Sequence, residues 1–371
     1  MQFVARKENL LKELSLIQGI VEKRSTRPIL SNALLEADNG SVAVYATDLE
    51  VGLSSRFQAE IGTAGAITAP AKKLADIVRL LPGDTDVSIE VLENHFLRIT
   101  CGKIEYKLAG APKEDFPNIP RPADGDGVDI PAGTLKQMIA NTIYGITTEE
   151  TRYALNGAQL AFDETNIRMV TTDAHRLAFI QYPFEGYSGE PREILIPRKT
   201  VAELRTLIGD DLETITFTST ENHFFFRIGE RTLDSRTLEG QFPSYEKVVP
   251  KDNDKKVVIN RVLFDDAIER VALLSHETSR AIRLSLSSGQ MLISSSHPEV
   301  GEAKEEIEVE YSGPEMKIGF NSRYLSDFLN TVSGDNVVLE LRDEAAAGLL
   351  RPEPNDEVGD YLYVIMPMRI S

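Results

Sequence analysis

The chain has 371 residues, of which 42% are hydrophobic and 7% aromatic, with no tryptophan. This length exceeds one ordinary hydrophobic core and predicts two or three domains of about 100 to 150 residues each, and the composition is that of a globular protein rather than a disordered one. The formal charge of −18 argues against nucleic-acid binding through an open face, because affinity for the phosphate backbone requires a positive surface.

The cysteine content and the N-terminus both point to the cytoplasm. Cys101 is the single cysteine, so it cannot form an internal disulfide, and it fits a reducing compartment. The first residues, MQFVARKENLL, lack an apolar segment behind their charges. No apolar run approaches the roughly 20 residues that a membrane span requires. We therefore expect a cytoplasmic protein that is neither exported by this signal nor membrane-spanning.

Helical and strand patterns alternate along the first third of the chain. Residues 8–23 carry apolar side chains on one stripe and predict an amphipathic helix. The segment SVAVYAT, residues 41–47, is typical of a strand. Residues 69–84, APAKKLADIVRLLPGD, predict a second helix that ends at Gly-Asp.

The same order of elements recurs twice more. Helices are predicted at 132–146, 196–211, 261–275 and 320–335, and strands at 166–172 and 290–296. Residues 343–360 have weak strand character. Each third of the chain therefore predicts an α+β unit with two helices and several strands.

Matching segments recur at a nearly constant offset, which indicates three repeats. ENHFLRI, from Glu93, returns as ENHFFFRI, from Glu221. The offsets are 125 from Thr47 to Thr172, 127 from Pro70 to Pro197, 126 from Pro117 to Pro243, and 124 from Pro197 to Asn321. Polar linkers at 121–129 and 250–255 separate the repeats. We predict three domains at 1–125, 126–253 and 254–371.

Basic residues concentrate on equivalent helices. The helix at 69–84 carries Lys72, Lys73 and Arg79 against Asp76, and the helix at 196–211 carries Arg198, Lys199 and Arg205 against Glu203. Residues 301–310 and 351–360 are acidic instead. Such charges can simply lie on a solvent-exposed helix face. Their repetition on equivalent helices, however, favours a shared basic surface within an otherwise acidic chain.

Known cofactor and metal motifs are missing from the sequence. There is no GxxxxGK[ST] phosphate loop and no GxGxxG after a strand, so no nucleotide cofactor is implied. The segment DGDGVD, residues 124–129, resembles the start of a Ca²⁺ loop, but Leu135 stands where a bidentate glutamate is required. The five histidines show no zinc spacing. We expect neither a cofactor nor a metal.

The segment TTDAHRLAF, residues 171–179, raises the question of catalysis. Asp173 and His175 could form the acid/base pair of a hydrolase. However, Thr172 and Asp173 match Thr47 and Asp48 of the first repeat, which predicts that the aspartate is a turn residue of the scaffold. Only the second repeat adds His175-Arg176-Leu177, and this favours a binding site.

The chain ends on apolar residues, YLYVIMPMRIS. A terminus of this kind would fray unless its side chains were buried. Methionine suits a surface that accepts several partners, so the segment could line a binding pocket. It could equally be an ordinary terminal core strand.

These motifs together resemble one protein family. RYALNG (152–157), TTDAHRLA (171–178), QFPSYEKVVPK (241–251) and YVIMPMRI (363–370), with the threefold repeat, are similar to the bacterial DNA polymerase III beta subunit, the DNA sliding clamp, over the whole chain. The resemblance implies a clamp fold in which two subunits join head to tail as a ring, with the helices lining the hole and antiparallel sheets outside.

The function that this resemblance implies is not enzymatic. Such a clamp encircles duplex DNA without regard to sequence and confers processivity on the replicative polymerase. Because enclosure holds the DNA, only the lining needs to be basic. The implied partners are the DNA polymerase III alpha subunit, the clamp loader, other polymerases and mismatch-repair proteins at replication forks in the nucleoid. A repeat protein that binds other proteins but not DNA is a further alternative.

The resemblance also implies site residues. A pocket for short apolar partner peptides would be formed by Leu155, Thr172, Ala174, His175, Arg176, Leu177, Pro243, Lys247, Val248, Asn321, Tyr324, Val364, Met366, Pro367, Met368 and Arg369. Residues facing DNA would be Arg24, Lys72, Lys73, Tyr153, Arg198 and Lys199. Tyr106 and Leu108 would contact Leu273 and Leu274 of the other subunit. The family usually has glycine at Ala174 and commonly arginine at Lys247.

Overall fold

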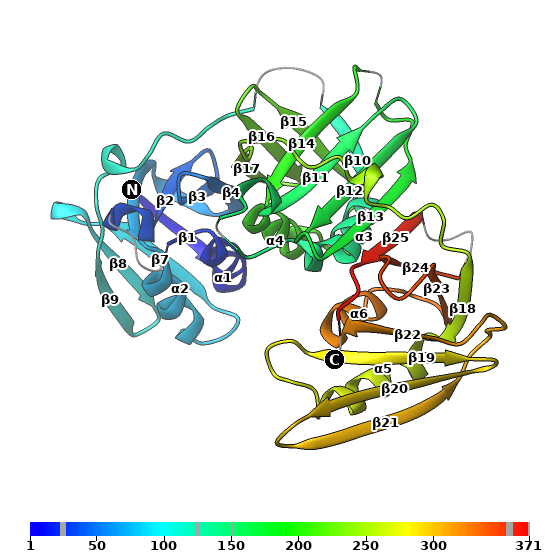
Figure 1. Cartoon of the computed structure of the whole chain (residues 1–371). Helices are drawn as coiled ribbons and strands as arrows, with labels where there is room; N and C mark the ends of the chain where they lie inside the picture. Colours follow the sequence, from blue (N-terminus) through cyan, green and yellow to red (C-terminus); the bar gives the residue numbers. More distant parts are fainter. Residues whose placement is uncertain (23–26, 123–126, 150, 188, 354–358, 370–371) are drawn as a thin grey trace. The chain divides into compact units, whose positions relative to one another are not determined.

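A computed structural model of the chain describes residues 1–22, 27–122, 127–149, 151–187, 189–353 and 359–369. Its contacts divide the chain into two compact units, which are described separately (Figure 1). Unit 1 comprises residues 1–136 and 199–237, and unit 2 comprises residues 137–198 and 238–371. Every strand pairing among the described residues is antiparallel, which confirms the α+β class.

Unit 1 contains two sheets. The five-stranded sheet has the order β5-β1-β7-β8-β9, formed by Glu60–Thr63, Gln2–Arg6, Asp86–Val91, Phe96–Cys101 and Ile104–Ala109. The eight-stranded sheet has the order β10-β15-β16-β17-β4-β3-β2-β6, formed by Val128–Pro131, Thr214–Ser219, His223–Ile228, Arg231–Arg236, Val51–Gln58, Ser41–Thr47, Asn32–Asp38 and Gly65–Pro70. Strands of the first and second repeats therefore share one sheet through the β17–β4 pair.

Unit 2 has the same plan. Its eight-stranded sheet has the order β14-β11-β12-β13-β25-β24-β23-β18, formed by Arg192–Pro197, Gly157–Phe162, Asn166–Thr172, Arg176–Pro183, Asp360–Ile365, Gly348–Pro352, Asn336–Leu341 and Lys255–Asn260. The four-stranded sheet has the order β21-β20-β19-β22, formed by Gly301–Glu308, Gln290–His297, Ala281–Ser287 and Met316–Asn321. Here the second and third repeats share a sheet through the β13–β25 pair.

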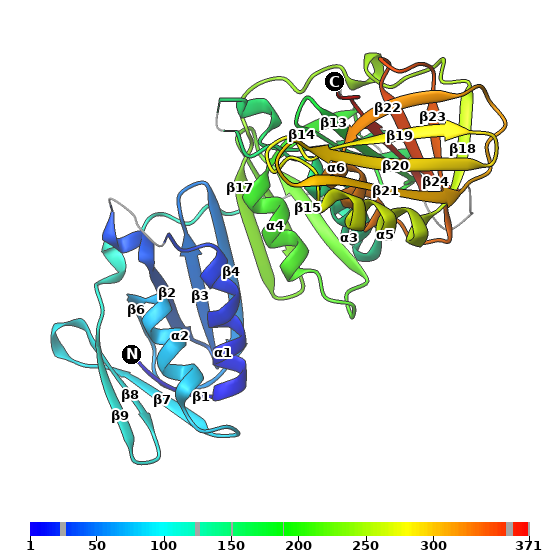
Figure 2. The same ribbon diagram turned by 60° about the horizontal axis from the view of Figure 1, so that its bottom comes forward.

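The described residues contain six α-helices, and these lie at the six predicted places. They are α1 (Lys7–Leu16), α2 (Ala71–Leu80), α3 (Ala132–Thr142), α4 (Arg198–Leu207), α5 (Arg261–Ala272) and α6 (Ser322–Leu329). Helices α1 and α2 contact each other beside the strands of unit 1, as Figure 2 shows, and α5 contacts α6 in unit 2. Short 3₁₀ helices lie at Ile17–Gly19, Pro28–Ser31, Glu93–His95, Lys113–Asp115, Ile143–Gly145, Tyr153–Leu155 and Tyr245–Lys247.

The helix sequences explain which faces are buried. In α2, Ala71, Leu74, Ala75 and Val78 recur at helical spacing and are buried, while the lysines between them are exposed. The N-terminus of α6 is capped by Asn321, whose side-chain oxygen accepts hydrogen bonds from two backbone amides of the first turn. No helix in the described ranges is long and apolar enough to span a membrane.

The helices end several residues before their predicted ends, and the region of weak strand character also differs from the structure. The first helix ends at Leu16, and residues 17–19 continue as a 3₁₀ turn rather than as the predicted helix to residue 23. The weak strand region 343–360 contains a full strand, β24, at Gly348–Pro352. Its apolar stretch is only three residues long, so the local sequence alone favours a strand weakly. Hydrogen bonds to β23 on one side and β25 on the other stabilise β24 as a strand.

Candidate functional site

The turn between β12 and β13 is built by the segment that first suggested catalysis. One carboxylate oxygen of Asp173 accepts the backbone N–H groups of His175 (2.9 Å) and Arg176 (3.0 Å). The hydroxyl of Thr172 donates to the carbonyl of Arg176 (2.6 Å) and accepts from the N–H of Ala174 (3.1 Å). Ala174 adopts a left-handed conformation with φ 73°, which costs free energy for a residue other than glycine.

The first repeat contains the same turn. Asp48 accepts the N–H groups of Glu50 (2.9 Å) and Val51 (2.7 Å), and the hydroxyl of Thr47 donates to the carbonyl of Val51 (3.1 Å). Leu49, the counterpart of Ala174, also has a positive φ of 79°. The Thr-Asp pair is therefore a scaffold turn in both repeats, as the sequence comparison predicted.

Arg176 is the centre of a buried polar network and is only 9% exposed. Its Nε donates to Asp173 (2.9 Å), its Nη1 to Asp327 (2.6 Å) and its Nη2 to the carbonyl of Tyr144 (2.6 Å). The guanidinium also lies 4.2 Å from the ring centroid of Tyr324. These contacts use all three nitrogens, and through them Arg176 connects β13 to α6 within unit 2.

Tyrosine hydroxyls extend this network into the core. The hydroxyls of Tyr144 and Tyr361 are 2.7 Å apart, and Tyr361 donates to the carbonyl of Asn141 (3.0 Å). Tyr363 donates to the carbonyl of Tyr324 (2.9 Å). Burial raises the pKa of Tyr144, Tyr361 and Tyr363 above the usual tyrosine value, so all three stay neutral hydrogen-bond donors at physiological pH.

The terminal segment of the chain lies beside this turn. β25 pairs with β13 so that Leu177 stands opposite Val364 and Arg176 opposite Ile365. Beyond the strand, the N–H of Met366 donates to the carbonyl of His175 (2.9 Å). The pairing is visible in Figure 1, where β25 lies next to β13. It brings the last residues of the third repeat onto His175, which only the second repeat carries.

A pocket of about 210 Å³ opens at this junction inside unit 2. Its floor continues the apolar core around Leu177 and Val364. Val248 and Met366 leave 48% and 43% of their surface exposed at the pocket. The residues that line it are Leu155, Thr172, Ala174, His175, Arg176, Leu177, Pro243, Tyr245, Val248, Val364 and Met366.

Most of the predicted pocket residues come together here, and six do not. Pro367, Met368 and Arg369 line a separate cavity with Arg283, Lys317 and Glu344. Asn321 caps α6 and donates to the carbonyl of Ser279 (3.2 Å). Tyr324 lies against the guanidinium of Arg176, and Lys247 is exposed in the 3₁₀ helix at 245–247.

Sequence reasoning missed Tyr245, which lines the pocket. Its ring centroid lies 5.6 Å from that of Phe179, so it packs on the core next to the pocket. The available signal was its position two residues after Pro243 in QFPSYEKVVP. An aromatic residue in a polar loop usually needs a packing partner, because its large apolar surface would otherwise face water.

The predicted DNA-facing residues have different surroundings. Lys72 and Lys73 are exposed on α2, Arg198 is exposed at the start of α4, and Tyr153 is 72% exposed. Lys199 is engaged within unit 1 instead, because its ammonium donates to the carbonyl of Ile20 (2.8 Å) and pairs with Asp48 (2.5 Å). Arg24 lies outside the described residues.

Two of the predicted interface residues lie on an edge strand, and the other two follow a helix. Tyr106 and Leu108 belong to β9, the last strand of its sheet, and Tyr106 is 37% exposed. Leu273 follows α5 and is 79% exposed, while Leu274 is half-buried. The acidic segment of 301–310 forms β21, the last strand of the four-stranded sheet.

The geometry does not favour the hydrolase alternative. Both carboxylate oxygens of Asp173 bind groups of its own turn, namely the amides of residues 175 and 176 and the Arg176 side chain. His175 is exposed, and its contact with Asp173 runs through the backbone rather than the imidazole. Among the described residues, no three His, Cys, Asp or Glu side chains are grouped as metal ligands.

Comparisons with known proteins agree over the whole chain. Family models described as the N-terminal, central and C-terminal domains of the DNA polymerase III beta subunit match residues 1–120, 129–244 and 246–369. The beta sliding clamps of Pseudomonas putida and Escherichia coli K12 are 38% and 33% identical over 371 residues, all of each chain. A crystal structure of a sliding clamp from Pseudomonas aeruginosa bound to griselimycin has a TM-score of 0.94 at 37% identity, covering 100% of both chains.

Proposed function

We propose, on the premise that this chain belongs to the DNA polymerase III beta subunit family, that two copies form a ring around duplex DNA and hold their partners through the apolar pocket of unit 2. The chain is a DNA sliding clamp, a processivity factor without catalytic activity of its own. The observation that carries the proposal is the pocket formed where β25 pairs with the loop-bearing strand β13.

The chemistry of the pocket suits a short apolar peptide. Leu155, Leu177 and Val364 form a floor that is continuous with the core, and the exposed surfaces of Val248 and Met366 would be covered by a bound side chain. Such partly exposed apolar groups contribute most to binding when a partner removes them from water. The polymerase alpha subunit, the clamp loader, other polymerases and mismatch-repair proteins are the partners we propose.

His175 and the network behind it have separate roles in this proposal. His175 is exposed at the pocket and can donate or accept a hydrogen bond with a peptide backbone. Arg176 holds the pocket wall in place through Asp173 and Asp327. A peptide would therefore meet an adaptable apolar floor with a rigid frame, which lowers the entropy lost on binding.

The test is peptide binding by a rim variant. Met366→Lys places a charge at the pocket without emptying the core, and we expect a peptide from the polymerase alpha subunit to bind at least about tenfold more weakly, a loss of roughly 1.4 kcal/mol. Val300→Lys is the matched control, because Val300 is 63% exposed and lies outside the pocket. Equal affinity of both variants and the wild type, measured by fluorescence anisotropy, would overturn this site.

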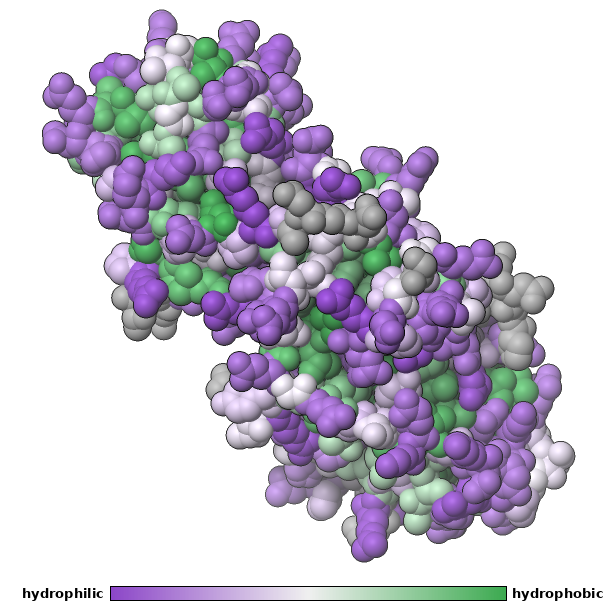
Figure 3. Space-filling view, turned by 90° about the horizontal axis from the view of Figure 1, so that it is seen from above, coloured by the Kyte–Doolittle hydropathy of each residue, from purple (hydrophilic) through white to green (hydrophobic). Residues whose placement is uncertain are grey.

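DNA would be held by enclosure rather than by strong contacts. The exposed lysines of α2 and the exposed Arg198 and Tyr153 support a weak basic surface, while the acidic exterior would discourage contacts elsewhere. Figure 3 shows hydrophilic residues over most of one face of the molecule, with hydrophobic groups between them. The ion pair of Lys199 with Asp48 reduces the charge that Lys199 can offer to DNA.

Enclosure has a direct test. The protein is loaded onto a nicked circular duplex by a clamp loader, and the circle is then linearised. We expect the protein to leave the linear DNA through its ends, while retention after linearisation would refute topological binding.

The proposed ring requires contacts between β9 of one copy and β21 of the other. Both are edge strands with free backbone groups. Lys103 precedes β9, and Glu302, Glu305 and Glu306 lie on β21, so opposite charges would meet. Leu273→Glu is expected to shift the protein towards the monomer in sedimentation velocity, and a dimer of unchanged stability would speak against this interface.

A further inference from the structure

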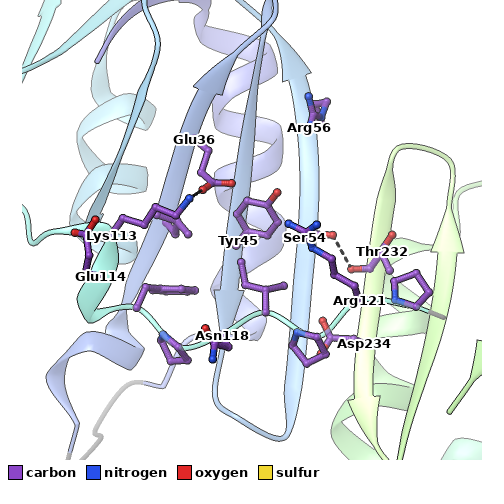
Figure 4. Close-up of a pocket in the computed structure, with 16 residues that line it drawn as sticks. Glu36, Tyr45, Ser54, Arg56, Lys113, Glu114, Asn118, Arg121, Thr232 and Asp234 are labelled. Atoms are coloured by element: carbon purple, nitrogen blue, oxygen red, sulfur yellow. Dashed lines mark hydrogen bonds and ion pairs between the residues drawn. The ribbon is translucent and has the colours of Figure 1, made fainter. Parts of the chain in front are cut away.

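A second cavity lies in unit 1, on the face of the large sheet that is turned away from the buried core residues Leu35, Val44 and Leu53. The segment 112–122 crosses this face as a strap containing Pro117, Pro120 and Pro122 (Figure 4). The space between strap and sheet is about 750 Å³, within the range of about 300 to 1,000 Å³ typical of small-molecule sites. Neither the proposed peptide pocket nor the proposed DNA-facing residues use it.

The sheet register explains which side chains enter the cavity. Tyr45 stands opposite Ser54, and Ser54 stands opposite Thr232, so these residues form a row across β3, β4 and β17. Two residues further along β17, Asp234 reaches the same face opposite Gly52. The row is visible beneath the strap in Figure 4.

Asp234 is a buried carboxyl group with very few partners. It is 6% exposed, and among the described residues only its own backbone N–H is a hydrogen-bond donor to it. Burial, together with the nearby charge of Asp48, raises its pKa to about 7. A Cβ on Gly52 would lie 2.4 Å from its Oδ1, so only glycine allows this carboxyl group to lie on the sheet.

Besides Asp234, the charged residues of the cavity are Glu36, Arg56, Lys113, Glu114 and Arg121, and only Glu36 and Lys113 form an ion pair among the described residues. Glu36 pairs with Lys113, and Arg56 donates to the hydroxyl of Ser41 (2.8 Å). Arg121 extends from the strap towards Ser54 and Tyr45 in Figure 4, and it has no ion-pair partner among the described residues. Burial raises the pKa of the Tyr45 hydroxyl, and the nearby Arg56 and Arg121 oppose part of that rise, which places Arg121 close to this ring.

The cavity thus presents a buried carboxyl group on its floor, Asp234, and a guanidinium without an ion-pair partner among the described residues on its strap, Arg121, with apolar surface from Phe116 and the prolines. A buried carboxylate whose only donor is its own backbone N–H is costly, and a ligand that supplies further N–H groups lowers that cost. We propose that this cavity binds a small zwitterion of amino-acid or dipeptide size, with its ammonium group on Asp234 and its carboxylate on Arg121.

The probe is glycyl-leucine, whose side chain can lie on the apolar part of the lining, which Phe116 and the prolines of the strap supply. Isothermal titration calorimetry with the full-length protein is compared with N-acetyl-glycyl-leucine, which lacks the ammonium group, and with glycyl-leucine amide, which lacks the carboxylate. We expect the dipeptide to saturate below about 10 mM and each blocked analogue to bind at least about tenfold more weakly.

Variants distinguish the two charged ends. Asp234→Asn keeps the shape of the side chain and is expected to abolish the preference for the free ammonium group, whereas Arg121→Ala abolishes the preference for the free carboxylate. Glu114→Gln is the matched control, because Glu114 lines the same cavity but is exposed; it should bind as the wild type does. Circular dichroism confirms that each variant is folded.

Two outcomes overturn the proposal. The first is the absence of saturation by the dipeptide at about 10 mM. The second is equal binding of the dipeptide and its blocked analogues, which would show that the charged groups are not recognised. Neither outcome bears on the clamp function, because partner-peptide binding and DNA sliding are measured at other residues.

Discussion

Replacing Arg176 tests whether this residue frames the pocket or touches the ligand. Arg176→Met keeps a long side chain against Tyr324 but leaves Asp173 and Asp327 without their cation and the carbonyl of Tyr144 without its donor. The side chains of Asp173 and Asp327 are only 13% and 27% exposed. Removing one partner of a buried ion pair costs about 3 to 5 kcal/mol, and the partial exposure of Asp327 favours the lower end.

The expected effect is large enough to measure by calorimetry. For a unit of this size, each kcal/mol lowers the midpoint of unfolding by about 2 to 4 °C, so unit 2 should unfold about 6 to 12 °C below the wild type. Arg342→Met is the matched control, since Arg342 and Asp343 form a pair that is about half exposed on both sides. Losing such a pair costs at most about 1 kcal/mol.

A double variant separates pairing from other effects. Arg176→Met combined with Asp327→Asn should recover part of the lost stability, because the second change removes one of the uncompensated charges. The reasoning is refuted if Arg176→Met unfolds within about 1 °C of the wild type. If Arg176→Met unfolded at the same temperature as the wild type but no longer bound the peptide, Arg176 would contact the peptide directly.

Three further substitutions test the energetics of the described turns and pairs. Ala174→Gly relieves a left-handed backbone and should raise the unfolding midpoint, with a gain of roughly 0.5 to 1 kcal/mol in calorimetry; a lower midpoint would contradict the strain. Asp234 titrates at about 7 in the folded protein against 3.8 as its ordinary value, so its ionisation removes stability as the pH rises from about 4 to 7. Asp234→Asn should therefore match the wild type near pH 4 and exceed it above pH 7 by up to about 4 kcal/mol, and a pH-independent difference would show that Asp234 is not the group responsible. Arg231→Met leaves Glu13, whose side chain is 7% exposed, without its partner and should cost about 3 kcal/mol in urea unfolding; adding Glu13→Gln should restore most of this loss, and no recovery would argue against a simple pair.

The helices were predictable because their signal is local. Apolar spacing identified all six, and α2 and α4 end within a few residues of the predicted Gly-Asp stops. The end of the first helix was not predictable to the same accuracy. Gly19 weakens helical order there, and a Cβ at that position would lie 2.2 Å from a carboxylate oxygen of Glu203, a contact across the sequence that no local pattern contains.

The candidate site was only partly predictable. The repeat comparison assigned Asp173 to a turn, and the structure has the same hydrogen bonds at Asp48. The positions of Tyr245 and Lys199 depended on packing instead. Tyr245 reaches the pocket through the core ring of Phe179, and the ammonium of Lys199 lies against Asp48, 151 positions earlier in the chain.

The sequence by itself determined the turns and the helices, because each depends on hydrogen bonds and apolar spacing between residues a few positions apart. It also determined the threefold repeat, because matching segments recur at a nearly constant offset. Only the tertiary structure decided that β25 pairs with β13, which brings Met366 onto the carbonyl of His175. It also decided that Asp234 is removed from water. Which strands pair and which side chains are buried depends on contacts between residues that lie far apart in the chain. The free energy of those contacts is therefore not visible in any local stretch of sequence.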